Sequence, residues 1–151
     1  MTIESDIQQS QFDNEYQKAL INLIYTHNYV VDRMSTVFKA YDITRQQYNV
    51  LRILRGQHPQ PVTINLIRDR MLEKMSDASR IVERLRIKGL IDRNKSATDK
   101  RTVEINISKK GLQLLANADE HVKSFELIFG NLSEGEAVQL NSLLDKVRKS
   151  I

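Results

Sequence analysis

Residues 92–111, "DRNKSATDKRTVEINISKKG", give the clearest indication of the fold of this chain. Within it, "TVEINI" (102–107) alternates polar and β-branched apolar residues, which is typical of a half-buried β-strand. The polar "KSATDK" (95–100) separates this run from an earlier extended one, "GLIDRN" (89–94). The sequence therefore predicts an antiparallel β-hairpin with a basic tip in solvent. The side chains expected to pack one face of the hairpin on helices are Ile91, Val103, Ile105 and Ile107.

Helical periodicity surrounds the hairpin on both sides. Predicted helices span about 12–40, 44–56, 63–72, 74–88 and 109–130, the last of these after Ser108, and a final helix follows Ser133. Thr44 with Gln47, and Ser133 with Glu136, form capping boxes. Gly89 is the residue expected just beyond the fourth helix. Four helices, a hairpin and two more helices form a winged helix-turn-helix flanked by extra helices. The predicted fold class is thus mainly α with a small β-hairpin.

In a helix-turn-helix the second helix of the pair lies in the DNA major groove. Here that helix is "KMSDASRIVERLRIKG", 74–89. Arg80 is the best candidate for a bidentate contact to guanine, and the alternative for Arg80 and Arg84 is a solvent-exposed salt bridge with Glu83 or Glu73. The residues of this helix expected to face DNA are Ser76, Asp77, Ser79, Arg80 and Arg84.

Asp77 is unusual at the start of such a helix, where small neutral polar residues are more common. One interpretation is a capping residue that also favours the helix dipole. The other interpretations are a contact to the amino group of cytosine, or repulsion of phosphate that lowers non-specific binding.

The charge of the chain is unevenly distributed. The chain of 151 residues has a net charge of +4, but residues 43–111 carry 16 Lys and Arg against 7 Asp and Glu. The two flanking parts, 1–42 and 112–151, together carry 7 against 12. A basic middle between acidic ends indicates that the middle faces a polyanion. The alternative is a solvated surface with uneven charge.

Composition and spacing argue against several other classes of protein. The chain contains no cysteine, which excludes disulfides and thiolate metal sites. Its three histidines, His27, His58 and His121, lie far apart, without metal-ligand spacing. We therefore expect no metal, no cofactor and no enzymatic activity. No apolar run is long enough for a membrane span, and the start of the sequence lacks a signal-peptide pattern, so the expected location is the cytosol.

The order of elements and three strings resemble the MarR family of bacterial transcription regulators, over about residues 12–149. "ASRIVERLRIKGLIDR" (78–93) is similar to the family's recognition helix running into the first wing strand. "TDKRTVEINISKKG" (98–111) resembles its wing with Asp-x-Arg and the serine that begins the next helix. "ITRQQYNVLRIL" (43–54) is similar to its second helix.

The resemblance implies a single MarR-like domain that forms an obligate homodimer on pseudo-palindromic double-stranded DNA. Residues 1–42 and 112–151 would form the helical dimerisation lobe, and 43–111 the winged-helix lobe. It further implies a regulator, expected to be a repressor, in the bacterial cytoplasm and associated with the nucleoid.

The wing roles also follow from the resemblance. Arg101 would enter the minor groove, where narrow width concentrates negative potential, and Asp99 would fix its guanidinium. The alternative for Asp99 is a simple turn former. Lys95 and Lys100 would contact DNA beside Arg101.

A regulatory ligand, a small aromatic or amphipathic molecule, is implied as well. Its expected pocket residues are Tyr25, Tyr29, Tyr48 and Arg52, for which core packing is the alternative. Two other functions stay open at this point: a non-specific architectural DNA-binding protein, and a winged helix that binds proteins instead of DNA.

Overall fold

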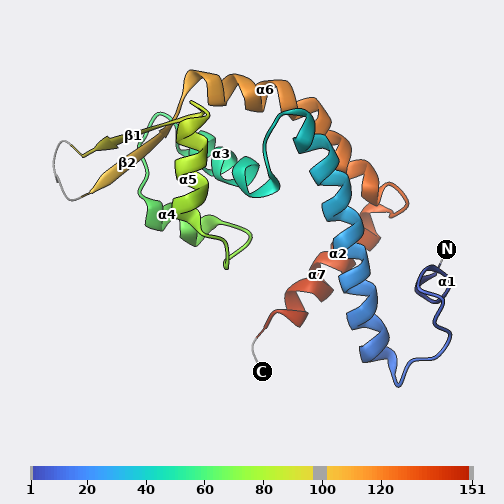
Figure 1. Cartoon of the computed structure of the whole chain (residues 1–151). Coiled ribbons are helices and arrows are strands. Elements are labelled where there is room, and N and C mark those ends of the chain that lie inside the picture. Colours follow the sequence, from blue (N-terminus) through green and yellow to red (C-terminus); the bar gives the residue numbers. More distant parts are fainter. Residues whose placement is uncertain (1, 97–101, 150–151) are drawn as a thin grey trace. The chain divides into compact units, whose positions relative to one another are not determined.

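The computed structural model describes residues 2–96 and 102–149, and these fall into two compact units, Met1–Thr36 and Val37–Ile151 (Figure 1). The elements are α1 (Ile3–Asp6), α2 (Glu15–Ala40), α3 (Arg45–Gln57), α4 (Ile64–Arg70), α5 (Ala78–Ile87), β1 (Ile91–Lys95), β2 (Val103–Ile107), α6 (Lys109–Lys123), the 3₁₀ helix η1 (Ser124–Phe129) and α7 (Glu134–Val147). The predicted fold class is confirmed. Among the described residues, no helix is both long and apolar enough to cross a bilayer.

The first unit consists of α1 and most of α2. The short α1 was not expected from the sequence. Its Glu4 accepts a charged hydrogen bond from Lys18 of α2 at 2.5 Å. This contact, together with backbone hydrogen bonding, lowers the pKa of Glu4 to about 2. The pair fixes α1 to α2 within this unit.

Helix α3 is the centre of the second unit and contacts α4, α5, α6 and β2. Five consecutive residues, 47–51, are buried, so the helix has no side that faces water along this stretch. Phe38, at the end of α2, stacks on Tyr48 of α3 with ring centroids 4.4 Å apart, and its edge meets Phe125.

The predicted helix starts are mostly confirmed by side-chain caps. Thr44 accepts from the backbone of Gln47, and the Gln47 side chain accepts in return from Thr44. Ser133 and Glu136 form the same reciprocal pair at α7. Gly89 has a positive φ of 70°, as expected of the residue that ends α5.

Two predicted helix boundaries are wrong. The fourth helix begins at Ala78, not at Lys74, because Ser76 and Asp77 bond locally and terminate the preceding turn instead of joining the helix. The predicted helix 109–130 is α-helical only to Lys123 and continues as the 3₁₀ helix η1. There the Ser124 hydroxyl donates back to the carbonyl of His121.

The hairpin pairs Ile91 with Ile107 and Lys95 with Val103 in antiparallel register. Ile91, Ile105 and Ile107 are buried as predicted, and Val103 is half-buried. Val62, just before α4, bridges to Ile105 on the other edge of β2. Figure 1 shows the hairpin extending from the side of α3 and α5. The wing is therefore attached to the helical body at its base.

Gly111 marks a close contact between α6 and the hairpin. A Cβ atom there would lie 2.3 Å from the Leu90 carbonyl oxygen and 2.8 Å from Ile107 Cγ1. Ser108 stabilises the same junction, since its hydroxyl donates to the Gly89 carbonyl and accepts from the Gly111 N–H. Close packing at this junction therefore requires a residue without a side chain at position 111, three residues after the capping Ser108.

We expect Gly111→Ala to lower the free energy of unfolding by about 1–3 kcal/mol, because the methyl group would force backbone or Ile107 to move. Gly135→Ala is the matched control, since nothing lies within 4 Å of a Cβ at that position. Urea denaturation of both variants measures the difference. Equal midpoints for the two variants would contradict the close packing at Gly111.

Candidate nucleic-acid interface

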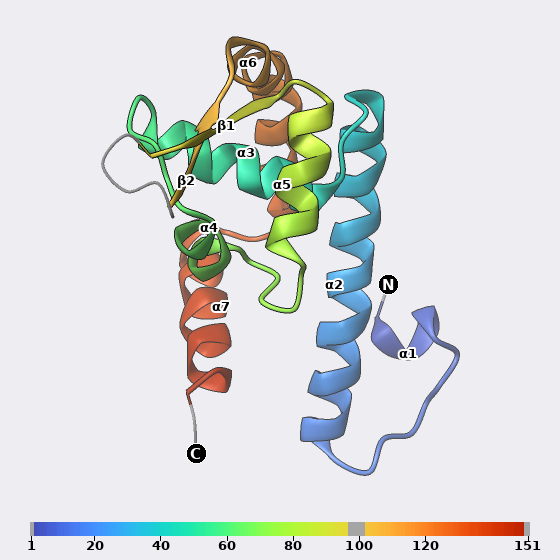
Figure 2. The ribbon, with the colours of Figure 1, turned by 60° about the vertical axis from the view of Figure 1, so that its left-hand side comes forward.

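Helix α5 has one buried and one exposed side. Ala78, Val82 and Leu85 are buried against α3, α4 and β1. Ser79, Arg80 and Arg84, three of the residues predicted to face DNA, are exposed on the opposite side. In Figure 2, α4 and the two strands of the hairpin lie to the left of α5.

Arg80 and Arg84 form no ion pair with any residue that the structure describes. The two acids that could have paired with them bind elsewhere. Glu83 pairs with Arg86 at 2.7 Å and with Arg93 of β1 at 3.6 Å. Glu73 pairs with Arg45 at 2.8 Å. The surface salt bridge expected as the alternative is therefore absent from the described residues, and both guanidinium groups are available to an anion.

Glu83 links the helix to the wing. Its hydrogen bonds from Arg86, with a further contribution from Arg93, hold the pKa of the Glu83 carboxyl below its ordinary value. The carboxylate therefore stays charged at neutral pH and orients Arg93. Since Arg93 is on β1, the contact fixes the base of the wing relative to α5.

Asp77 is the N-cap of α5. Its side chain accepts a hydrogen bond from the backbone N–H of Arg80 at 3.0 Å. The capping interpretation is thus seen directly, because a capping carboxylate satisfies a free N–H group and favours the helix dipole. Its predicted contact with DNA stays a prediction. Ser76 is half-buried beside Glu73, with its hydroxyl 3.3 Å from that carboxylate.

The turn before α5 is held by side-chain contacts that the sequence did not predict. The Asn49 side chain, on the buried part of α3, accepts from the backbone N–H of Leu72 at 3.0 Å. Glu73 accepts from Gln46 at 2.8 Å in addition to its ion pair with Arg45. The available signal was the polar Asn49 between the apolar residues Tyr48 and Val50.

The described part of the wing exposes polar side chains. Asp92, Arg93, Asn94 and Lys95 are all exposed, so the predicted DNA contact of Lys95 is on an accessible strand. Lys100, Arg101 and the orienting Asp99 lie outside the described residues, and their roles remain predictions.

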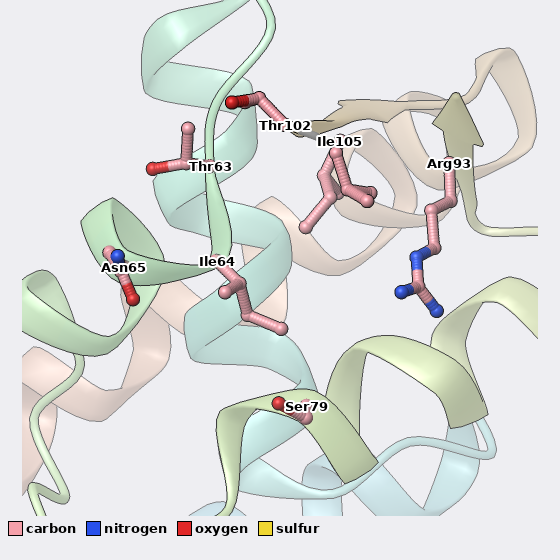
Figure 3. A pocket seen from close by; sticks show the side chains of 8 residues that line it. Thr63, Ile64, Asn65, Ser79, Arg93, Thr102 and Ile105 are labelled. Carbon is pink, nitrogen blue, oxygen red and sulfur yellow. The ribbon is translucent and has the colours of Figure 1, made fainter. Parts of the chain in front are cut away.

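A pocket of about 370 Å³ opens between α4, α5 and the hairpin (Figure 3). Its lining residues are Thr63, Ile64, Asn65, Ser79, Arg93, Thr102, Val103 and Ile105. In Figure 3 the Arg93 guanidinium extends from β1 toward the helix that carries Ser79. Hydroxyl, amide and guanidinium groups beside two isoleucines suit a small anion with an apolar body.

The expected ligand-pocket residues lie in different units. Tyr25 and Tyr29 are in the first unit and partly exposed, and Arg33 stacks over the Tyr29 ring at 4.5 Å. Tyr48 is buried in the second unit, where burial raises the pKa of its phenol. Arg52 is exposed. Core packing accounts for the burial of Tyr48. A ligand pocket formed by these four residues together stays a prediction.

Polar contacts join α6 to α3 and to Tyr41, the residue that follows α2. Arg55 of α3 binds both carboxylate oxygens of Asp119 at 3.0 Å. The Tyr41 hydroxyl donates to the Asn117 carbonyl at 2.9 Å and lies 2.7 Å from His121 Nδ1. Within residues 2–96 and 102–149, no group of three His, Cys, Asp or Glu side chains could hold a metal ion.

The comparisons with known proteins agree on one family. The model described as "MarR family" matches residues 41–102. The transcriptional regulator MgrA of Staphylococcus aureus is 32% identical over 114 residues, 74% of each chain. The transcriptional repressor IacR of Pseudomonas putida is 28% identical over 126 residues, 83% of this chain and 74% of that one.

Solved structures give the same result. A MarR transcription factor from Planctomyces limnophilus is 31% identical, with a TM-score of 0.69 over 89% of this chain and 98% of that one. Two more distant structures share the fold. They are MepR of S. aureus bound to DNA (24% identity, TM-score 0.75, 91% and 97% covered) and BpsR of Bordetella bronchiseptica, whose DNA binding is regulated by 6-hydroxynicotinic acid (19%, 0.79, 94% and 100%).

We expect Asp77→Ala to destabilise the protein by about 1 kcal/mol, and Asp77→Asn to have little effect, since both Asp and Asn cap helices. Thermal unfolding of the two variants separates the contribution of the capping hydrogen bond from that of the charge, because Asn retains the hydrogen bond and Ala retains neither. If Asp77→Asn were as destabilised as Asp77→Ala, the interaction of the Asp77 charge with the helix dipole would contribute more to stability than the capping hydrogen bond.

Proposed function

Because the chain belongs to the MarR family of transcription regulators, we propose that it represses transcription as a homodimer bound to a pseudo-palindromic operator. The predicted family is confirmed, and the relatives are transcription regulators, which confirms that the chain is not an enzyme. The observation that carries the proposal is the exposed side of α5, with Arg80 and Arg84 unpaired among the described residues.

The electrostatics support DNA as the partner. Residues 43–111, with 16 basic and 7 acidic side chains, include α3, α4, α5 and the hairpin. Cations on such a surface displace counterions from phosphates, and the helix in the major groove reads bases. In this proposal Arg80 reads guanine, Lys95 and Lys100 bind phosphates, and Arg101, oriented by Asp99, enters the minor groove.

Exposed apolar side chains support the dimer. On α2 these include Tyr16, Leu20 and Ile24, exposed by 87%, 58% and 52%, and α7 has no buried residue. Such faces mark protein interfaces. We assign 1–42 and 112–151 to the dimerisation lobe. A two-fold axis would then place two α5 helices about 34–36 Å apart, one turn of DNA.

The pocket at Arg93 and Ser79 supports release by a ligand. It is lined by Ser79 of α5 and by both strands of the wing, so a small aromatic anion in it would compete with DNA for the same surface. Repression would follow from an operator that overlaps a promoter, since the bound dimer and the polymerase cannot occupy it together.

We expect Arg80→Ala to weaken binding to the preferred operator by about 1–3 kcal/mol for each guanine that Arg80 reads in the wild type. The matched control is Arg86→Ala on the same helix, because Arg86 is paired with Glu83. Fluorescence anisotropy over a salt series, on the operator and on a scrambled duplex, measures both variants. Equal affinity of the wild type for the two duplexes would indicate a non-specific architectural protein. The absence of binding at low salt would indicate a protein-binding winged helix.

The dimer gives a separate prediction. Sedimentation velocity should show a dimer for the wild type and dissociation for Leu20→Glu, because a buried unpaired carboxylate is costly. Leu72→Glu, at a leucine 78% exposed in the DNA-binding part, should stay dimeric. A monomeric wild type at micromolar concentration would refute the proposed assembly.

A further inference from the structure

The loop between α4 and α5 holds two large apolar side chains in water. Met75 is 99% exposed and Leu72 is 78% exposed. Figure 2 shows this loop projecting beyond the first turn of α5. A single exposed apolar residue needs no explanation, but these two share a short segment with fixed backbone.

The backbone of this loop is fixed from three directions. Met71 is buried at its start, and the next N–H, that of Leu72, donates to the side chain of Asn49. Glu73 is bound by Arg45 and Gln46 of α3. The backbone N–H of Ser76 donates to the Glu73 carbonyl at 3.2 Å. The loop therefore presents Met75 in a preset position, which reduces the entropy lost when that side chain meets a partner.

The surroundings of Met75 indicate which partner it meets. It precedes the N-cap Asp77 by two residues, next to the exposed Lys74 and five residues before the exposed Arg80. An exposed apolar side chain close in sequence to these two cations suits a surface that is anionic and carries isolated apolar groups. The major groove of DNA is such a surface, since phosphates line it and the thymine methyl group is its apolar feature.

We propose that Met75 is a specificity-determining residue that contacts the 5-methyl group of a thymine in each half of the operator. This inference rests on the proposed function. It adds one base, contacted from the loop before α5, to those that α5 is proposed to read. The unbranched, polarizable thioether adapts to a methyl group in the groove.

Deoxyuridine tests the contact, because it pairs as thymine does and lacks only the methyl group. The probe is the duplex most enriched from a random-sequence pool by the wild-type protein, with each thymine replaced in turn. Removal of one contacted methyl should weaken wild-type binding roughly fourfold, equivalent to about 0.8 kcal/mol for a buried methylene-sized group. Met75→Gln should bind the thymine and uracil duplexes equally, and Met75→Leu should retain the preference.

Ile87→Ala is the matched control, since Ile87 is 71% exposed at the other end of α5 and should leave the preference unchanged. A wild type that ignores every uracil substitution would overturn the inference. Met75→Gln with an undiminished thymine preference would also overturn it. In both cases sequence-specific binding would still stand. If the pool yields no enriched duplex, the proposed function fails, and this inference fails with it.

Discussion

The burial of residues 47–51 of α3 on all sides is the constraint on which the second unit depends. A helix that exposes one face can tilt on its neighbours, whereas residues 47–51 of α3 are enclosed by packing. Tyr48 holds the end of α2 through Phe38, and Arg55 holds α6 through Asp119. Since α4, α5 and β2 also contact α3, one element sets the positions of the helix and the wing that we propose to face DNA.

Polar contacts then fix what apolar packing leaves adjustable. Apolar surfaces can slide at little cost, but a hydrogen bond to a buried group has a narrow geometry. The buried Asn49 holds the chain where it leaves α4 through such a hydrogen bond. On the exposed side, Asp77 caps the first turn of α5, and the ion pair of Glu83 with Arg93 at 3.6 Å links α5 to β1. A recognition surface with this support loses little conformational freedom on binding.

Local signals in the sequence predicted much of this fold. Capping boxes, Gly89 and the alternation in 102–107 depend on residues within a few positions of each other, and these predictions were confirmed. The start of α5 was predicted four residues too early, because helical periodicity does not show that Ser76 and Asp77 will bond to their own turn.

The candidate site was predictable only in part for the same reason. The exposure of Arg80 and Arg84 follows from helical periodicity. The partners of Glu73 and Glu83 do not, since Arg45 is 28 positions from Glu73 and Arg93 is on a different element. The role of Asn49 also depends on a distant contact, with the backbone of Leu72.

The geometry of the small sheet has a consequence for solubility. β2 is covered on both edges, by β1 and by the bridge to Val62, whereas β1 is hydrogen-bonded within the described residues to β2 alone. An open strand edge can recruit strands from other chains and start aggregation. The charged side chains Asp92, Arg93 and Lys95 oppose such pairing on β1. A wing whose exposed charges were neutralised would therefore lose this protection against edge-to-edge pairing, whatever it binds.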